Sequence, residues 1–298
     1  MRLPLVSICI PTYNGAQFIA EAIDSAMAQT YSNVEIVVSD DASVDDTLEI
    51  INAYRAKTNI PIHIHQHQPN GIGANWNHCI KKAKGTFIKF LFQDDVLLPD
   101  CISKMVQVME ADKSVAIVAS KRNFIVEDSF IDEDSDQWIQ MYGDLQHTLP
   151  FQTANDVMLL DYNLFRESTF FESPMNKVGE PTTILFRKDL IDQIGYFRED
   201  LKQVLDYEFC YRVLKKQRIA IINKPLVAFR LHGKQTTVIN KQSNAYTEDF
   251  TIYEQLVYKN YRKHLHPETK KRLSRKYNKC IGAFYDTIDA IRSLIPKK

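Results

Sequence analysis

Short apolar runs alternate with segments of helical periodicity over the first 120 residues. The apolar runs lie at 5–10, 34–39, 60–65, 87–92 and 115–119. Between them, apolar residues recur every three or four positions, in segments near 18–27, 47–57, 75–84 and 99–110. A short apolar run is typical of a buried strand, and the wider spacing is typical of an amphipathic helix. The pattern predicts an α/β fold with a mostly parallel sheet covered on both faces by helices.

The alternation becomes weaker after residue 120. The stretch 127–136 is acidic and has few apolar residues, so we interpret it as an exposed loop. Further along the chain, the pattern predicts helices at 153–164 and 204–216 and strands at 182–186 and 219–222. From about residue 240 the chain has helical character to its end, and its basic residues have few acids close in sequence. We therefore expect an α/β domain over residues 1–235 and a helical C-terminal extension over residues 236–298.

Composition and charge narrow the class of protein. The 298 residues are 45% hydrophobic and 25% charged, as in an ordinary soluble globular protein. The formal net charge is zero, which argues against nucleic acid as the partner. No apolar run approaches the length that spans a bilayer, and we do not expect the N-terminal residues to form a signal peptide. The five cysteines are scattered without metal-binding spacing, so we expect reduced thiols and a cytoplasmic protein.

Polar clusters follow several of the predicted strands. In an open α/β sheet, ligands bind beyond the carboxyl ends of the strands. Asp94 and Asp95 end the run 87–92, and two carboxylates there can hold a hard divalent cation that in turn holds a phosphate. The alternative for this pair is a solvated turn or a helix cap.

Two further clusters follow the first and second strands. Pro11, Thr12 and Tyr13 precede an Asn-Gly turn, and the tyrosine ring offers a flat surface for stacking on a base. Asp41 could accept hydrogen bonds from a ribose or a pyrimidine N–H group. Their alternatives are an ordinary βα turn and helix capping.

The second half of the chain supplies two more candidates. Asp206 lies near the start of the predicted helix 204–216, where a carboxylate can act as a general base or simply interact with the helix dipole. His232 follows a short apolar run and could complete the coordination of a metal, or could be an exposed loop residue. His63, His65 and His67 alternate along a strand, which suits either a zinc site or a polar strand face, and we favour the polar face.

Taken together, these motifs resemble the family 2 glycosyltransferases of the GT-A fold. The resemblance covers residues 4–235 and depends on the order and spacing of several segments. In chain order these are 6–15, 34–47, 70–77, 85–87, 93–95, 179–187, 194–197, 206–208 and 230–233. The resemblance implies an inverting enzyme with a Rossmann-like nucleotide-binding half, a nucleoside-diphosphate sugar donor (UDP- or dTDP-sugar) and a divalent cation, Mn²⁺ or Mg²⁺.

The resemblance also implies roles for single residues. The nucleoside pocket would contain Pro11, Thr12, Tyr13 and Asp41, with Asn77 at a polar position of the donor site. Asp94 and Asp95 would contact ribose and metal, His232 would reach the metal or the diphosphate, and Asp206 would be the catalytic base. The chain departs from the family pattern at Phe92, Trp76 and Leu205, where many members have Asp, Arg and Glu. The first departure leaves open whether Asp94 or Asp95 is the direct ligand.

The implied reaction transfers a sugar to an acceptor hydroxyl, in a setting such as bacterial cell-surface polysaccharide biosynthesis. The acceptor would be a saccharide or a lipid-linked saccharide. The basic helical tail could contact the inner face of the cell membrane. The alternatives are an inactive nucleotide-sugar-binding partner subunit and a sugar nucleotidyltransferase. The surviving carboxylates argue against the first, and the lack of a basic glycine-rich loop after the first strand argues against the second.

Overall fold

The computed structural model describes residues 3–131, 135–149, 156–235 and 245–293. A nine-stranded sheet forms its centre, with strand order β3-β2-β1-β4-β8-β6-β9-β5 and with β7 paired to β9. The strands are β1 Val6–Thr12, β2 Val34–Asp40, β3 Ile62–Gln66, β4 Phe87–Phe90, β5 Val96–Leu97, β6 Val115–Val126, β7 Val157–Leu160, β8 Ile184–Arg187 and β9 Arg218–Leu231. The α/β fold class is therefore confirmed, but the sheet is mixed and not mostly parallel, because four of its strand pairs in the described residues are parallel and four are antiparallel.

The N-terminal half of the sheet is parallel. Strand β1 pairs in parallel with β2 and β4, and β2 pairs in parallel with β3. The other half is mixed, because β8 runs antiparallel to both β4 and β6. Since β9 is parallel to β6, its carboxyl end lies at the same edge of the sheet as those of β1, β2 and β4. That shared edge is where an α/β sheet places its ligands.

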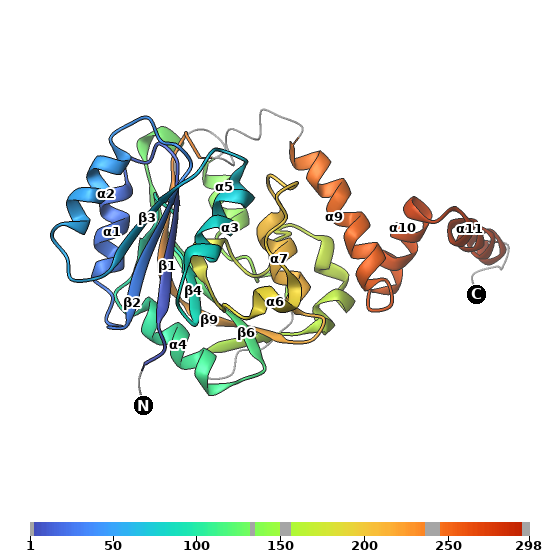
Figure 1. The fold of residues 1–298 in the computed structure, drawn as a ribbon. Helices are drawn as coiled ribbons and strands as arrows, with labels where there is room; N and C mark the ends of the chain where they lie inside the picture. The colour runs from blue at the N-terminus through green and yellow to red at the C-terminus, as the bar shows by residue number, and fades with distance from the viewer. Residues whose placement is uncertain (1–2, 132–134, 150–155, 236–244, 294–298) are drawn as a thin grey trace.

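Helices cover both faces of the sheet (Figure 1). The helices of the described residues are α1 Ile19–Met27, α2 Thr47–Arg55, α3 Ile72–Lys82, α4 Cys101–Ala111, α5 Ser135–Tyr142, α6 Leu190–Ile194, α7 Leu205–Val213, α9 Ala245–Tyr261, α10 Pro267–Tyr277 and α11 Lys279–Ser293, of which α10 and α11 extend away from the sheet. Short 3₁₀ turns lie at Asp128–Phe130, Tyr162–Arg166, Ser168–Phe171 and Pro181–Thr183. Figure 1 shows α1 and α2 on one side of the sheet and α3, α6 and α7 on the other.

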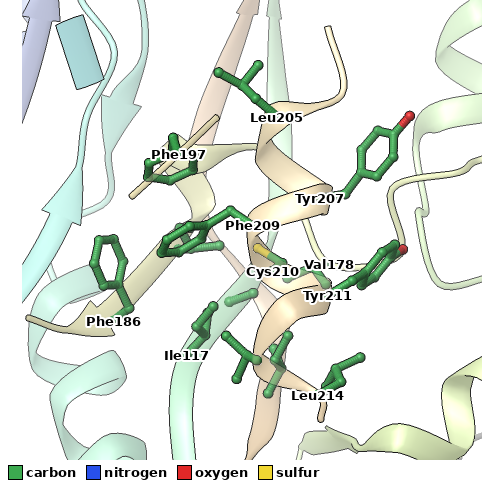
Figure 2. Packing of buried hydrophobic residues seen from close by; sticks show 14 of the residues in the cluster. Ile117, Val178, Phe186, Phe197, Leu205, Tyr207, Phe209, Cys210, Tyr211 and Leu214 are labelled. Carbon is green, nitrogen blue, oxygen red and sulfur yellow. The ribbon is translucent and has the colours of Figure 1, made fainter. Parts of the chain in front are cut away.

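Alternate residues of each central strand enter different cores. Ile8 and Ile10 pack with the residues of α1 and α4, whereas Cys9 between them packs with those of α3 and α7. This is the two-residue period of a strand that is buried on both faces. Around α7, the ring of Phe209 stacks on Phe197 with the centroids 4.0 Å apart (Figure 2). The tight packing fixes the helix whose first turn carries Asp206.

One predicted helix is wrong. Of the segment 153–164, residues 153–155 lie outside the described residues, but Val157–Leu160 is the strand β7 and Tyr162–Arg166 is a 3₁₀ turn. The apolar run at 157–160 suits a strand or a buried helix equally, and pairing with β9 decides for the strand. The acidic stretch 127–136 is only partly a loop, because it contains one 3₁₀ turn and the start of α5.

The C-terminal helices correct the interpretation of the basic tail. Lys271, Arg272, Arg275 and Lys276 of α10 all form ion pairs with acids that are distant in sequence. Glu254 of α9, whose side chain is almost fully buried, accepts two of these cations. Four of the tail's basic residues are therefore neutralised by ion pairs within the molecule. In the described part of the chain, no helix combines the length and the apolar character needed to cross a membrane.

Candidate active site

A cavity of about 370 Å³ lies at the carboxyl edge of the sheet. The β1–α1 loop, the turn after β4, the first turn of α7 and the segment after β9 all contribute to its wall. The lining residues are Pro11, Thr12, Tyr13, Asp41, Ile72, Asn75, Trp76, Phe92, Gln93, Asp94, Glu180, Pro181, Lys202, Gln203, Leu205, Asp206, Phe229, Lys234 and Gln235. Six of the residues that the sequence predicts for the site are among them: Pro11, Thr12, Tyr13, Asp41, Asp94 and Asp206.

Gln93 holds the β1–α1 loop in place. Its Oε1 accepts hydrogen bonds from Thr12 Oγ1 at 2.6 Å and from the Tyr13 backbone N–H at 2.9 Å. Its Nε2 donates to the Tyr13 carbonyl at 3.2 Å. The tyrosine ring itself is 54% exposed beside the cavity. A fixed backbone with a free ring is an arrangement that allows a planar base to stack.

Asp41 sits in a polar corner of the cavity with two neighbours, one directly after β3 and one from α3. His67 Nε2 lies 3.5 Å from Asp41 Oδ1 and 3.2 Å from Asn75 Oδ1. Asn75 in turn donates to the Thr12 carbonyl at 3.3 Å. Burial raises the pKa of Asp41, which the charge of His67 partly opposes and that of Asp40 increases. His67 therefore links two cavity-lining side chains, a role that the sequence did not suggest.

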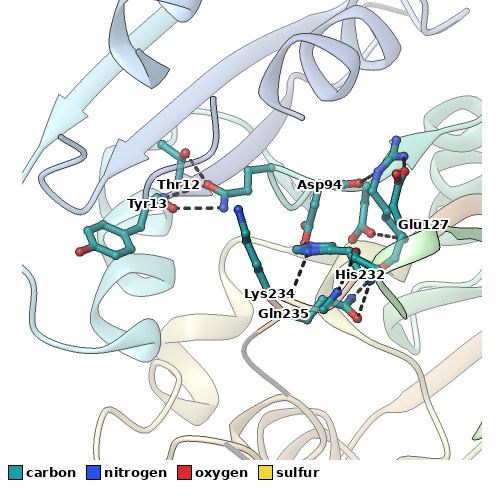
Figure 3. A network of polar contacts seen from close by, with 12 residues as sticks. Thr12, Tyr13, Asp94, Glu127, His232, Lys234 and Gln235 are labelled. Carbon is teal, nitrogen blue, oxygen red and sulfur yellow. Dashed lines mark hydrogen bonds and ion pairs between the residues drawn. The ribbon is translucent and has the colours of Figure 1, made fainter. Parts of the chain in front are cut away.

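The two adjacent aspartates point in different directions. Asp94 lines the cavity, and its Oδ2 lies 3.0 Å from His232 Nε2 (Figure 3). Asp95 is 1% exposed, and its Oδ1 accepts the backbone N–H of Arg230 at 2.9 Å. Burial, and then the charge of Asp94, raises the pKa of Asp95 well above its usual range. His232 thus contacts the cavity-lining Asp94 from behind the wall, while Asp95 joins the turn to β9.

Arg230 strengthens this junction. Its Nε donates to the Asp94 carbonyl at 2.8 Å, and its two terminal nitrogens pair with Glu21 of α1 and Glu127 after β6. Its guanidinium also lies over the ring of Phe18, 4.7 Å from the centroid. Four segments of the chain therefore meet at one buried cation, beside the residues that face the cavity.

The donor set at Asp94 and His232 fits a divalent cation that is shared with a substrate. The described residues contain no group of three or more His, Cys, Asp or Glu side chains placed to hold a metal on their own. Mg²⁺ and similar ions commonly bind through one or two side chains and complete their coordination with water and substrate phosphates. A carboxylate and an imidazole 3.0 Å apart at a cavity wall match this incomplete type of site.

Asp206 lies in the wall of the same cavity, at the N-terminal end of α7. Asn176 Nδ2 donates to its Oδ2 at 2.9 Å. Burial raises the pKa of Asp206 to about 7, and the nearby charge of Glu180 adds to the effect, whereas the Tyr207 backbone N–H opposes it. A carboxyl with a pKa near neutrality is suited to accept a proton from a hydroxyl. Glu208 is buried away from the cavity and pairs with Arg212 at 3.1 Å.

One of the sequence-based assignments does not match the structure. Asn77 lies outside the cavity, where it is buried and hydrogen-bonds both the backbone N–H and the carbonyl of Phe197. Asn75, two positions earlier and on another side of α3, lines the cavity instead. His63 pairs with Glu35 at 3.4 Å, in agreement with the polar strand face that we favour over a zinc site.

Several cavity residues were missed by the sequence analysis. Gln93 directly precedes the aspartate pair, and Lys234 and Gln235 directly follow His232, so their proximity to known motifs was an available signal. Lys234 points from the end of β9 toward the β1–α1 loop (Figure 3). Lys202 and Gln203, just before α7, carried no comparable signal. The cavity thus has two lysines to face an anionic ligand.

Comparison with known proteins agrees with this geometry. Residues 7–171, more than half of the chain, match the model of glycosyl transferase family 2. The chain belongs to this family. An uncharacterised glycosyltransferase of Rickettsia typhi is 31% identical over 236 residues, which cover 78% of this chain and 66% of that protein. The chain therefore spans just under two thirds of the length of this relative. The Escherichia coli protein UDP-Glc:alpha-D-GlcNAc-diphosphoundecaprenol beta-1,3-glucosyltransferase WfaP is 37% identical over 129 residues, 43% of this chain and 49% of that protein.

Solved structures of two glycosyltransferases share the fold. Staphylococcus aureus TarS 1-349 in complex with UDP-GlcNAc has a TM-score of 0.61 and 20% identity, over 91% of this chain and 71% of that one. The mannosyltransferase PcManGT from Pyrobaculum calidifontis, in complex with GDP-Man and Mn²⁺, has a TM-score of 0.58 and 15% identity, over 97% of this chain and 81% of that one. At these identities the likeness concerns the fold, and it confirms the expected GT-A architecture.

Proposed function

We propose that the protein is an inverting glycosyltransferase that moves a sugar from a nucleoside-diphosphate sugar to an acceptor hydroxyl. The observation that carries the proposal is one cavity bounded by the β1–α1 loop with Tyr13, by Asp94 with His232, and by Asp206. These groups suit, in that order, a nucleoside, a metal-bound diphosphate and an acceptor hydroxyl. Membership of glycosyl transferase family 2 supports the same reaction class.

The donor half of the cavity combines stacking, hydrogen bonding and charge. Tyr13 would stack on the base, while Asp41 would accept a hydrogen bond from the nucleoside. Asp94 and His232 would hold Mn²⁺ or Mg²⁺, which supplies Lewis-acid stabilisation to a leaving diphosphate. Lys234, which points toward the same space, would add a positive charge. That TarS and PcManGT were solved with UDP-GlcNAc and with GDP-Man and Mn²⁺ supports a nucleotide-sugar donor and a divalent cation.

The acceptor half depends on Asp206. In its ionised form this carboxylate would take the proton of the acceptor hydroxyl as the oxygen attacks the anomeric carbon. A single displacement of this kind inverts the anomeric configuration and requires no second carboxylate as nucleophile. The hydrogen bond from Asn176 orients the Asp206 carboxylate within the cavity wall. The side chain is half-buried, and its Oδ1 is inaccessible to solvent.

For the setting, we propose bacterial cell-surface polysaccharide assembly, with residues 1–235 as the catalytic domain and 236–298 as its extension. WfaP, by its name, uses UDP-Glc and a lipid-linked acceptor, which supports a UDP-sugar donor and a lipid-linked saccharide acceptor for this chain. Such an acceptor would place the reaction at the inner face of the membrane. The paired charges of α10 give no separate support for membrane contact.

Calorimetric titration of UDP-glucose and UDP-N-acetylglucosamine, with and without Mn²⁺, tests the donor site. We expect Mn²⁺ to tighten binding to the wild type and Asp94→Asn to remove this gain. Asp95→Asn is the matched control, because an amide oxygen can still accept the Arg230 N–H. The proposal is wrong if the wild type binds neither nucleotide sugar in the presence of Mn²⁺. Release of free UDP on turnover, and not of pyrophosphate, would exclude a nucleotidyltransferase.

A further inference from the structure

Four carboxylates line the cavity, and the proposed function uses three of them. Asp41 faces the nucleoside, Asp94 the metal and Asp206 the acceptor. Glu180 also lines the cavity, but the proposed reaction assigns it no role. It lies directly before the 3₁₀ turn Pro181–Thr183, in the segment that leads into β8.

The position of Glu180 relative to the other carboxylates is informative. It lines the same cavity as Asp94 and Asp206. Burial, and then the charge of Glu180, raises the pKa of Asp206, which agrees with this arrangement. The Glu180 carboxylate therefore shares the cavity with both the proposed metal ligand and the proposed base.

Arg122 of β6 fixes the Glu180 carboxylate. The Arg122 side chain is 3% exposed, and its Nη2 lies 2.9 Å from Glu180 Oε1. The same nitrogen donates to the Tyr142 carbonyl at 2.9 Å. The guanidinium lies over the rings of Phe124 and Phe229, 5.0 and 5.8 Å from their centroids. A buried cation with this many contacts holds its partner carboxylate in one orientation.

The reaction geometry then predicts what this carboxylate meets. In a single displacement, the anomeric carbon lies between the leaving diphosphate and the hydroxyl that the base activates. The sugar ring must therefore lie between Asp94 and Asp206, in the cavity that Glu180 also lines. An ionised carboxylate only accepts hydrogen bonds, and the free hydroxyls of a sugar ring are donors. Neighbouring Leu205 is apolar and cannot accept such a bond.

We propose that Glu180, positioned by Arg122, accepts a hydrogen bond from a ring hydroxyl of the transferred sugar and so selects among donor sugars. This inference rests on the proposed function. It makes Glu180 a specificity-determining residue and Arg122 the residue that positions it. Glu180→Gln keeps the size of the side chain but removes its charge and replaces one of its two acceptor oxygens with an NH₂ donor.

The first experiment measures selectivity by titration in the presence of Mn²⁺. The probes are UDP, UDP-glucose, UDP-galactose and UDP-N-acetylglucosamine, followed by the 2-, 3-, 4- and 6-deoxy forms of the sugar that the wild type binds most tightly. We expect one deoxy analogue to bind the wild type at least about tenfold more weakly than its parent, because a hydrogen bond to a charged group is lost. In Glu180→Gln this difference should shrink to within about twofold.

Two controls separate this role from others. UDP affinity should stay within about twofold in Glu180→Gln, because UDP lacks the sugar, and Glu49→Gln on exposed helix α2 should resemble the wild type throughout. If Glu180→Gln does not fold, Glu180→Asp keeps the charge but withdraws it, and should lose the same discrimination. Unchanged discrimination among the deoxy analogues would overturn the inference, as would an equal loss of UDP affinity. A wild type that binds no nucleotide sugar would overturn the proposed function instead.

Discussion

Two neighbouring residues of the same type have different environments at this site. Asp94 faces the cavity and His232, whereas Asp95 faces inward and accepts the Arg230 N–H. Both residues lie in the short turn between β4 and β5, yet their carboxylates have different partners. The sequence alone could place both carboxylates at a strand end but could not distinguish them. The structure favours Asp94 as the residue that contacts a bound metal.

Asp206→Asn is expected to lower the rate of sugar transfer by at least about a hundredfold, because an amide cannot accept the proton. Donor affinity should change little, since Asp206 acts on the acceptor. Glu208→Gln is the matched control, because that carboxylate pairs with Arg212 outside the cavity. Steady-state kinetics with a fixed acceptor measures both. Near-normal turnover in Asp206→Asn would move the base elsewhere in the cavity.

The pH dependence follows from the same residue. Because the pKa of Asp206 is about 7, kcat/KM should rise about tenfold per pH unit at lower pH and level off above neutrality. This rise of kcat/KM with pH should be absent in Asp206→Asn. The stability effect has the opposite sign: the raised pKa contributes stability that is complete below pH 3.8 and is lost as the pH rises through about 7. If kcat/KM of the wild type does not change from pH 5 to 8, the assignment of Asp206 as the base is wrong.

At the scale of elements, the β1–α1 loop depends on a close approach between Gly15 and Gln93. A methyl group added at Gly15 would lie 2.7 Å from Gln93 Cδ, closer than carbon atoms can pack. Gly15→Ala should therefore displace the Gln93 side chain and release the backbone of Tyr13. Losing about two hydrogen bonds predicts UDP binding weaker by roughly tenfold, with little change in the free energy of unfolding.

The double variant provides the control for this prediction. If Gly15→Ala acts through Gln93, adding it to Gln93→Ala should cause no further loss of UDP affinity. Calorimetry measures the affinities, and urea denaturation measures the free energies of unfolding. Additive losses would mean that the glycine has a separate role in the loop.

Strands and helices with a clear apolar pattern could be predicted accurately from the sequence. Strands β1, β2 and β4 were predicted to within about two residues because their runs are uninterrupted and both faces are buried. Strand β9 is much longer than the predicted 219–222, because Asn223, Lys224 and Pro225 resemble a break but lie in a bulged stretch paired with β6. Helix α3 was predicted, but not which of Asn75 and Asn77 faces the cavity. That choice depends on the angle at which the helix packs, which no local pattern encodes.

At the scale of the whole molecule, long-range ion pairs change the character of the C-terminal helices. Because Glu254, Asp286 and Asp289 neutralise cations of α10, we expect the wild type to bind anionic vesicles weakly even at low salt. Glu254→Gln should increase this binding, because it releases Arg272 and Lys276. Co-sedimentation with phosphatidylglycerol vesicles at low and high salt measures both. Strong, salt-sensitive binding of the wild type would mean that other basic residues suffice.

The contacts of Arg230 and His232 also have a consequence for how the protein is made. Arg230 pairs with Glu21 across 209 residues, and His232 meets Asp94 across 138. During synthesis, the N-terminal strands and helices leave the ribosome long before these partners exist. A growing chain can therefore pair β1, β2 and β4 early, yet the metal-facing side of the cavity stays unfinished until residue 232 has emerged. We therefore expect stalled nascent chains to bind a nucleotide sugar in a metal-dependent way only once residue 232 has emerged from the ribosome.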